Sequence, residues 1–160
     1  MKNGSYQQQT IAGMNRVELV VALYDGMVRF LFRAVRAIEE GNVRERRAAI
    51  RRALDILMHL QSRLRMDVGG PAKTLSEFYA AVFALCIEGS RLASAERLHE
   101  AIQCIRNVRE AWHQIAQSSE VNNLETRKNS ASPAAAPAPE PIPMPIEVLT
   151  DSREASRWTA

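Results

Sequence analysis

Between Asn15 and Gln117 the sequence contains a single proline and only three short groups of turn-forming residues, and this scarcity of breaks restricts the fold more than any other feature. The breaks fall at Gly41–Asn42, Gly69–Pro71 and Gly89–Ser94. No stretch between them alternates apolar and polar residues as a half-buried strand would. Apolar residues instead recur every three to four positions, the spacing of one helix face. The pattern predicts helices and no β-sheet.

Capping residues mark the expected helix ends. Asn15 is followed three residues later by Glu18, a capping-box pattern in which the Asn side chain binds a free backbone N–H and the Glu side chain bonds back to the cap. Asn42 and Glu45 repeat the pattern directly after Gly41, a residue suited to the left-handed conformation that follows a helix. We therefore expect four helices, at residues 15–41, 42–66, 72–88 and 95–117.

The connections between these helices are short, and Ser94 caps the last helix. Long helices joined by short turns must run antiparallel to their neighbours. The predicted fold is all-α, an antiparallel up-down four-helix bundle.

The composition changes near Gln117. Residues 118–128 are polar and aperiodic, and six of the 7 prolines lie between residues 133 and 145. Proline lacks an amide donor and fixes φ, so this stretch predicts an extended spacer rather than a helix or strand. We expect an extended N-terminal segment at 1–14, a bundle domain at 15–117 and a disordered Pro/Ala-rich tail at 118–160. Trp158 near the end is either a short docking motif or part of an unstructured end.

The third expected helix has more apolar surface than a bundle core requires. Leu75, Phe78, Val82 and Leu85 would serve the core, yet a second apolar row lies beside them. That row consists of Tyr79, Phe83, Cys86 and Ile87. Excess apolar surface either is covered or binds a partner. Two interpretations remain: an exposed binding surface, or a central helix covered by the segment around Ile11 and Met14.

Residues for catalysis or for cofactor binding are scarce. Di-iron bundles place a Glu-x-x-His motif on each of two helices, whereas Glu96/His99 and Glu110/His113 lie on one helix and away from its apolar face. Cys86 has no metal-binding or redox spacing, and no glycine-rich phosphate loop is present. We expect no enzyme activity, no metal and no cofactor; a ferritin-like metalloprotein is a second alternative, which elemental analysis of the purified protein would test.

Nucleic-acid binding is the main alternative of another class. The second expected helix carries a row of arginines that could contact phosphates, although no aromatic residues interleave with them for base stacking. The row consists of Arg44, Arg46, Arg47, Arg51, Arg52, Arg63 and Arg65. The formal net charge of the chain is only +3. We therefore expect no nucleic acid among its partners.

The chain has no apolar run long enough for a membrane helix, and its polar first ten residues lack the apolar centre of a signal peptide. Its 2 cysteines are too few for a disulfide scaffold. We expect a cytoplasmic protein.

Three stretches together resemble the FliS family of flagellar secretion chaperones. They are a short N-terminal segment at residues 6–9 with a leading Tyr6, the Glu-Leu…Leu-Tyr-Asp-Gly pattern at 18–26, and Arg-Glu-Ala-Trp at 109–112. The Gly-Gly turn followed by Leu75 and Phe78-Tyr79 also fits, and the resemblance spans roughly residues 5–117. Two departures are Arg16-Val17, where the family often has a proline before Glu-Leu, and a longer tail.

The resemblance implies an antiparallel bundle that binds the disordered C-terminal segment of flagellin, prevents premature polymerisation and delivers this client to the flagellar type III export gate at the membrane. It implies that the N-terminal segment, with Tyr6 and Ile11, takes part in the handover or covers the empty groove. As exposed client-binding residues we predict Met58, Tyr79, Phe83 and Ile87. The sequence is compatible with a homodimer.

Overall fold

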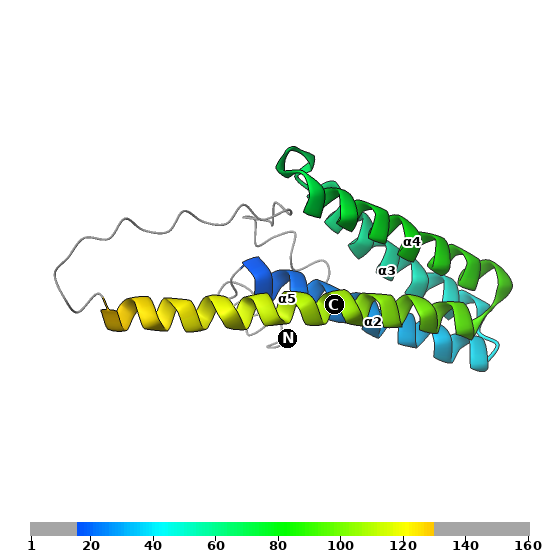
Figure 1. Ribbon diagram of the computed structural model, residues 1–160. Helices are drawn as coiled ribbons and strands as arrows, with labels where there is room; N and C mark the ends of the chain where they lie inside the picture. Colours follow the sequence, from blue (N-terminus) through cyan, green and yellow to red (C-terminus); the bar gives the residue numbers. More distant parts are fainter. Residues whose placement is uncertain (1–15, 130–160) are drawn as a thin grey trace, which may run out of the picture.

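The structure is a computed structural model that describes residues 16–129. It contains four long helices and one short 3-10 helix, with no β-strand among the described residues. The elements are α2 (Arg16–Glu39), α3 (Val43–Ser62), η1 (Met66–Val68), α4 (Gly70–Leu92) and α5 (Ala95–Asn129). Figure 1 shows α5 lying along α2, with α3 and α4 as the second pair. The all-α bundle is confirmed. The predicted cap Asn15 and the residues before it lie outside the described residues.

Contacts between side chains give the helix directions. On α2, Asp25 pairs with Arg109 of α5, whereas Phe32, two turns later, lies against His99, nearer the start of α5. Residue numbers therefore rise on α2 as they fall on α5, so these two helices are antiparallel. Each helix has two neighbours in a ring, and α2 and α4 are diagonal.

The turn between α2 and α3 forms as its sequence predicts. Gly41 has a φ of 65°, and the N–H of Asn42 donates to the carbonyl of Ala37, so the end of α2 is closed by a left-handed glycine. The Asn42 side chain accepts the N–H of Glu45 at 3.0 Å. The Glu45 carboxylate does not return to the cap; it pairs with Arg33 on α2 at 2.7 Å.

The break expected at Gly89–Ser94 is shorter than predicted. Helix α4 runs through Gly89 to Leu92 and ends at Ala93, which has a φ of 51°. The Ser94 side chain then caps α5 by accepting the N–H of Arg97. Gly89 therefore does not break the helix. It lies against Leu98 of α5, and a side chain at this position would collide with Leu98.

The end of α5 differs most from the prediction. We expected a helix end near Gln117 and a disordered segment from Ser118, but α5 continues to Asn129. No glycine or proline interrupts residues 113–129, so nothing in this stretch stops a helix. The apolar periodicity disappears there because the helix extends past its packing partners, as Figure 1 shows. The remainder of the predicted tail, with Trp158, lies outside the described residues.

The core is aliphatic with two tyrosines at its centre. Tyr24 of α2 and Tyr79 of α4 are both buried, and their hydroxyl oxygens lie 2.7 Å apart across the bundle. Burial raises the pKa of Tyr24 to about 12, an effect partly opposed by its hydrogen bond to Tyr79. Burial also raises the pKa of Tyr79, and the neighbouring Tyr24 raises it further. Both phenols are therefore neutral at any physiological pH.

Cys86 lies in the same core, and we expect it to make the protein less stable in alkaline solution. Burial raises the pKa of its thiol from 9.0 to about 12. The folded state thus retains a proton that the unfolded chain releases above pH 9, so the free energy of unfolding falls as the pH rises from 9 towards 12.

The slope of this fall is at most about 1.4 kcal/mol per pH unit for one thiol. Urea titrations followed by circular dichroism at pH 8 to 11 would measure it, with Cys86→Ala as the comparison. The variant should show a shallower fall, because it lacks this proton linkage. Parallel pH profiles for the two proteins would contradict the burial of this thiol.

Candidate functional site

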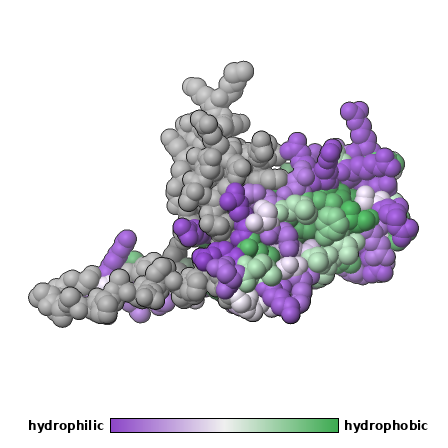
Figure 2. All heavy atoms as spheres, turned by 90° about the horizontal axis from the view of Figure 1, so that it is seen from above, coloured by the Kyte–Doolittle hydropathy of each residue, from purple (hydrophilic) through white to green (hydrophobic). Residues whose placement is uncertain are grey.

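An apolar surface lies where α3 and α4 pack side by side. Three of its side chains are large and exposed: Met58 of α3 at 56%, and Phe83 and Ile87 of α4 at 40% and 43%. Figure 2, which views the molecule from the side of α3 and α4, shows a patch of hydrophobic residues bordered by hydrophilic ones on both sides. We call this surface the α3–α4 groove.

The groove contains a hollow of about 250 Å³. Its lining comes only from these two helices: Leu57, Met58, Gln61, Ser76, Tyr79, Ala80 and Phe83. No charged side chain takes part in this lining. Ala80 and Ser76 are small residues about one and two turns before Phe83, and they leave the space that the hollow occupies. Ile87 continues the apolar row one turn beyond Phe83.

One hydrogen bond joins the two sides of the groove. The Gln61 amide nitrogen donates to the Ser76 hydroxyl at 2.9 Å. The Gln61 amide oxygen is buried and has no partner within the described part of the chain. A buried acceptor without a donor is costly.

The expectation that Tyr79 is exposed is wrong. Its side chain is 1% exposed. Tyr79 is one of the residues that line the hollow, but it is not part of the exposed apolar surface. The prediction placed the core face of this helix one position away from where it lies. The buried residues of α4 are Ala72, Tyr79, Val82, Cys86 and Gly89, whereas Leu75, Phe78 and Leu85 are only partly buried. The reason is the hydrogen bond to Tyr24, because it satisfies the Tyr79 hydroxyl inside the core.

The structure brings together the other predicted groove residues. Met58, Phe83 and Ile87 are exposed as expected, while Tyr6 and Ile11 lie outside the described residues. Sequence reasoning missed Gln61, Ser76 and Ala80. A signal for the latter two existed, since small residues at one-turn intervals before an exposed Phe predict a recess. Leu92 and Met66 are further exposed apolar residues that were not singled out.

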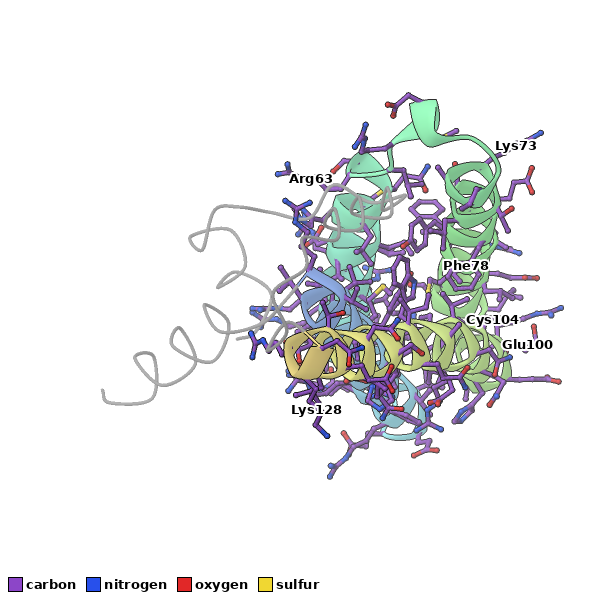
Figure 3. All side chains as sticks on the ribbon, turned by 60° about the vertical axis from the view of Figure 1, so that its left-hand side comes forward. Arg63, Lys73, Phe78, Glu100, Cys104 and Lys128 are labelled. Carbon is purple, nitrogen blue, oxygen red and sulfur yellow. The ribbon has the colours of Figure 1, made fainter. Side chains whose placement is uncertain are left out.

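Charged residues lie at the end of the α3–α4 groove where the chain crosses between the two helices. Figure 3 shows Arg63 and Lys73 at the end of the bundle where the chain crosses from α3 to α4, while Lys128 marks the far end of α5. None of these three residues lines the hollow, so contacts inside it are apolar contacts or neutral hydrogen bonds.

No group of three or more potential metal ligands occurs among the residues that the structure describes. The two Glu-x-x-His motifs of α5 make other contacts. The His99 ring meets the Phe32 ring edge-on at 6.1 Å, and His113 hydrogen-bonds with Gln117. On the apolar face of α5, Leu98, Ile105 and Trp112 are buried, whereas Ile115 is 48% exposed.

Of the seven arginines in the predicted row, five are exposed and two are half-buried, and Arg63 and Arg65 lie beyond the end of α3. Arg65 pairs with Asp67, and Arg52 lies with its guanidinium 5.8 Å from the centre of the Phe30 ring. Among the described residues no helix is long and apolar enough to cross a membrane.

A small antiparallel helical bundle with an exposed apolar groove belongs to the class of proteins whose fold can accommodate an amphipathic helix. The sequence model of the family described as flagellar protein FliS matches residues 1–119. The chain therefore belongs to the FliS family.

Three named relatives agree with this assignment. The flagellar secretion chaperone FliS of Vibrio cholerae is 30% identical over 108 residues, which is 67% of this chain and 78% of the relative. The protein of the same name from Campylobacter jejuni is 28% identical over 123 residues, covering 76% and 91% of the two chains. That from Salmonella typhimurium is 30% identical over 101 residues, covering 62% and 75%. Membership of this chaperone family supports an export chaperone role and not an enzymatic one.

Proposed function

We propose that this protein is a cytoplasmic export chaperone for flagellin, which binds the disordered C-terminal segment of flagellin and delivers it to the flagellar type III export gate. The observation that carries the proposal is the α3–α4 groove, where Met58, Phe83 and Ile87 are exposed beside a hollow without charges. The family supplies the flagellar context.

The geometry suits an amphipathic helix as the guest. Phe83 and Ile87 are one helical turn apart, and a guest helix presents its own apolar residues at the same interval. Met58 faces them from α3, and its unbranched, polarisable side chain adapts to different guest side chains. A segment that folds only in the groove is kept from assembling with other copies of itself, which is how the chaperone would prevent premature polymerisation.

The energetics suit a delivery function. Burial of apolar surface gives about 25 cal/mol per Å². Ordering a disordered client offsets much of that gain. The resulting complex is tight enough to hold the client and loose enough to release it at the export gate. We propose the N-terminal segment, with Tyr6 and Ile11, as a cover for the empty groove or as part of the handover; both residues lie outside the described range.

The test is to place charges in the groove and measure binding of the C-terminal peptide of flagellin. In the double variant Phe83→Asp, Ile87→Asp, two carboxylates would have to be desolvated against the guest, so we expect at least a tenfold loss of affinity by isothermal calorimetry. The helical circular dichroism should persist, because both side chains are exposed in the native protein.

Val43→Asp is the matched control. Val43 is equally exposed but lies in the first turn of α3, away from the hollow, where a carboxylate is favourable. It should bind the peptide as the unaltered protein does. Unchanged binding by the double variant would disprove the groove as the client site, and so would equal losses in both variants.

Salt separates this function from the nucleic-acid alternative. Binding through the α3–α4 groove should change little between 50 and about 300 mM salt, whereas binding to phosphates falls steeply over that range. The same calorimetric titration at two salt concentrations gives the answer. A steep fall for the flagellin peptide would mean that arginines, and not the apolar residues, carry the contact.

A further inference from the structure

A second hollow, of about 270 Å³, lies on the other side of α3, in the seam between α2 and α3. It is lined by Phe30, Arg33, Glu45, Ala48, Ala49 and Arg52. We call it the α2–α3 pocket. Its lining shares no residue with that of the α3–α4 groove.

Two guanidinium groups stand over one aromatic ring in this pocket. The guanidinium carbons of Arg33 and Arg52 lie 6.0 and 5.8 Å from the centre of the Phe30 ring, and the ring itself is buried. Ala48 and Ala49 supply the space, because longer side chains there would fill it. The contact with the ring orients both guanidinium groups and lowers the entropic cost of using them.

The charges in the pocket are unbalanced. Glu45 pairs with Arg33 at 2.7 Å. Arg52 has no ion pair among residues 16–129, and the same is true of the exposed Arg29, one turn before Arg33 on α2. The pocket thus presents the Arg52 guanidinium, held over the Phe30 ring with free donors, next to the Arg33 guanidinium, which already binds one carboxylate.

From this geometry we infer that the α2–α3 pocket binds a carboxylate side chain from an acidic segment of a protein partner. The carboxylate takes the free donors of Arg52 and shares Arg33 with Glu45. This partner is distinct from the apolar client, because the α3–α4 groove offers no charge to an acidic chain. The inference stands on the pocket alone and does not depend on the proposed flagellin binding.

Two other anionic partners fit the pocket less well. Nucleic-acid bases need an open aromatic face, whereas Phe30 is buried beneath the arginines. An anionic membrane needs exposed apolar residues for insertion, and apart from Arg and Glu the pocket is lined by two alanines and that buried ring. A planar fork in a recess is suited to a carboxylate, which it can bind with two parallel hydrogen bonds.

The experiment is an NMR titration of the full chain with a ten-residue peptide of alternating Glu and Ser, which carries carboxylates and no apolar side chain. The matched peptide has Gln in place of Glu. We expect the Glu peptide to shift the amide signals of Ala48, Ala49 and Arg52 in a saturable way, and the Gln peptide to leave them in place.

Variants then assign the effect to the pocket. Arg52→Glu should lower the affinity for the Glu peptide at least tenfold, in line with the loss of a charged hydrogen bond. Arg47→Glu makes the same change in net charge on the same helix outside the pocket, and it should weaken binding much less. Glu45→Gln releases Arg33 from its ion pair and should tighten binding, a gain that a damaged fold would not produce.

Four outcomes would overturn the inference. The first three are equal binding of the two peptides, amide shifts confined to residues outside the pocket, and equal losses of affinity in the two Arg variants. The fourth comes from binding measurements with phosphatidylglycerol vesicles and with a single-stranded RNA: Arg52→Glu would reduce binding to either of them more than it reduces binding to the Glu peptide.

Discussion

Replacing Tyr79 by Ala will lower the free energy of unfolding by about 3–5 kcal/mol, the usual cost of removing a large aromatic side chain from a packed core. Tyr79 is among the largest fully buried side chains, and its hydroxyl group meets that of Tyr24 at 2.7 Å. The substitution leaves a cavity at the centre of the bundle and removes the partner of a buried hydroxyl group. Urea unfolding followed by circular dichroism measures the change.

Two further variants separate the contributions of the hydrogen bond and of burial to this loss of stability. Tyr79→Phe keeps the ring and removes only the hydrogen bond, so we expect a cost of about 1 kcal/mol. Phe83→Ala, one turn along the same helix, removes an exposed ring and should cost well under half as much as Tyr79→Ala. If Phe83→Ala proved the more damaging of the two, the rotation of α4 described above would be incorrect.

The second large effect is expected at Gly89, where α4 packs against Leu98 of α5. A Cβ atom at this position would lie 2.6 Å from Leu98 Cδ2 and 2.9 Å from Leu98 Cγ. Leu98 is itself fully buried and has little room to move. Gly89→Val should therefore destabilise the protein by about 2–3 kcal/mol, even though glycine is a poor helix former.

Ala84→Val is the control for helix propensity, because Ala84 is an exposed position on the same helix. It should cost only the difference in propensity, roughly 0.6 kcal/mol. Thermal unfolding by calorimetry compares the two variants. A loss at Gly89→Val no larger than that at Ala84→Val would show that Leu98 yields to the new side chain, which would contradict the predicted collision.

The ends of helices could be predicted from sequence where a specific hydrogen bond or backbone conformation is required. Gly41 adopts the left-handed conformation, and Asn42 and Ser94 cap the helices that follow them. These features depend on neighbours within a few residues, so local sequence contains the necessary information. The partner of the Glu45 carboxylate did not follow the local pattern, because Arg33 from another helix competes with the cap.

The exposed face of α4 was predicted only in part. Phe83 and Ile87 are exposed as the excess of apolar residues indicated, but Tyr79 is not. On a helix that is apolar nearly all round, the pattern does not select the inner face. That choice came from a residue 55 positions away, since Tyr24 offers Tyr79 a partner inside the core. The residues around Tyr79 in the sequence do not indicate that such a distant hydrogen-bond partner exists.

The second hollow illustrates a different limit. The arginine row on α3 was visible in the sequence, but the contribution of α2 was not. The pairing of Arg52 with Phe30, and of Glu45 with Arg33, depends on the register between two helices. Sequence periodicity gives the face of each helix but not how far one helix is shifted along the other.

The overhang of α5 has a geometric consequence. Beyond Gln117 the helix continues past the other described helices to Asn129, roughly 12 residues or about 18 Å at 1.5 Å per residue. Anything joined to the end of α5 therefore starts about 18 Å beyond Gln117 along the helix axis. A reporter inserted after Asn129 would accordingly start beyond the packed part of the described helices.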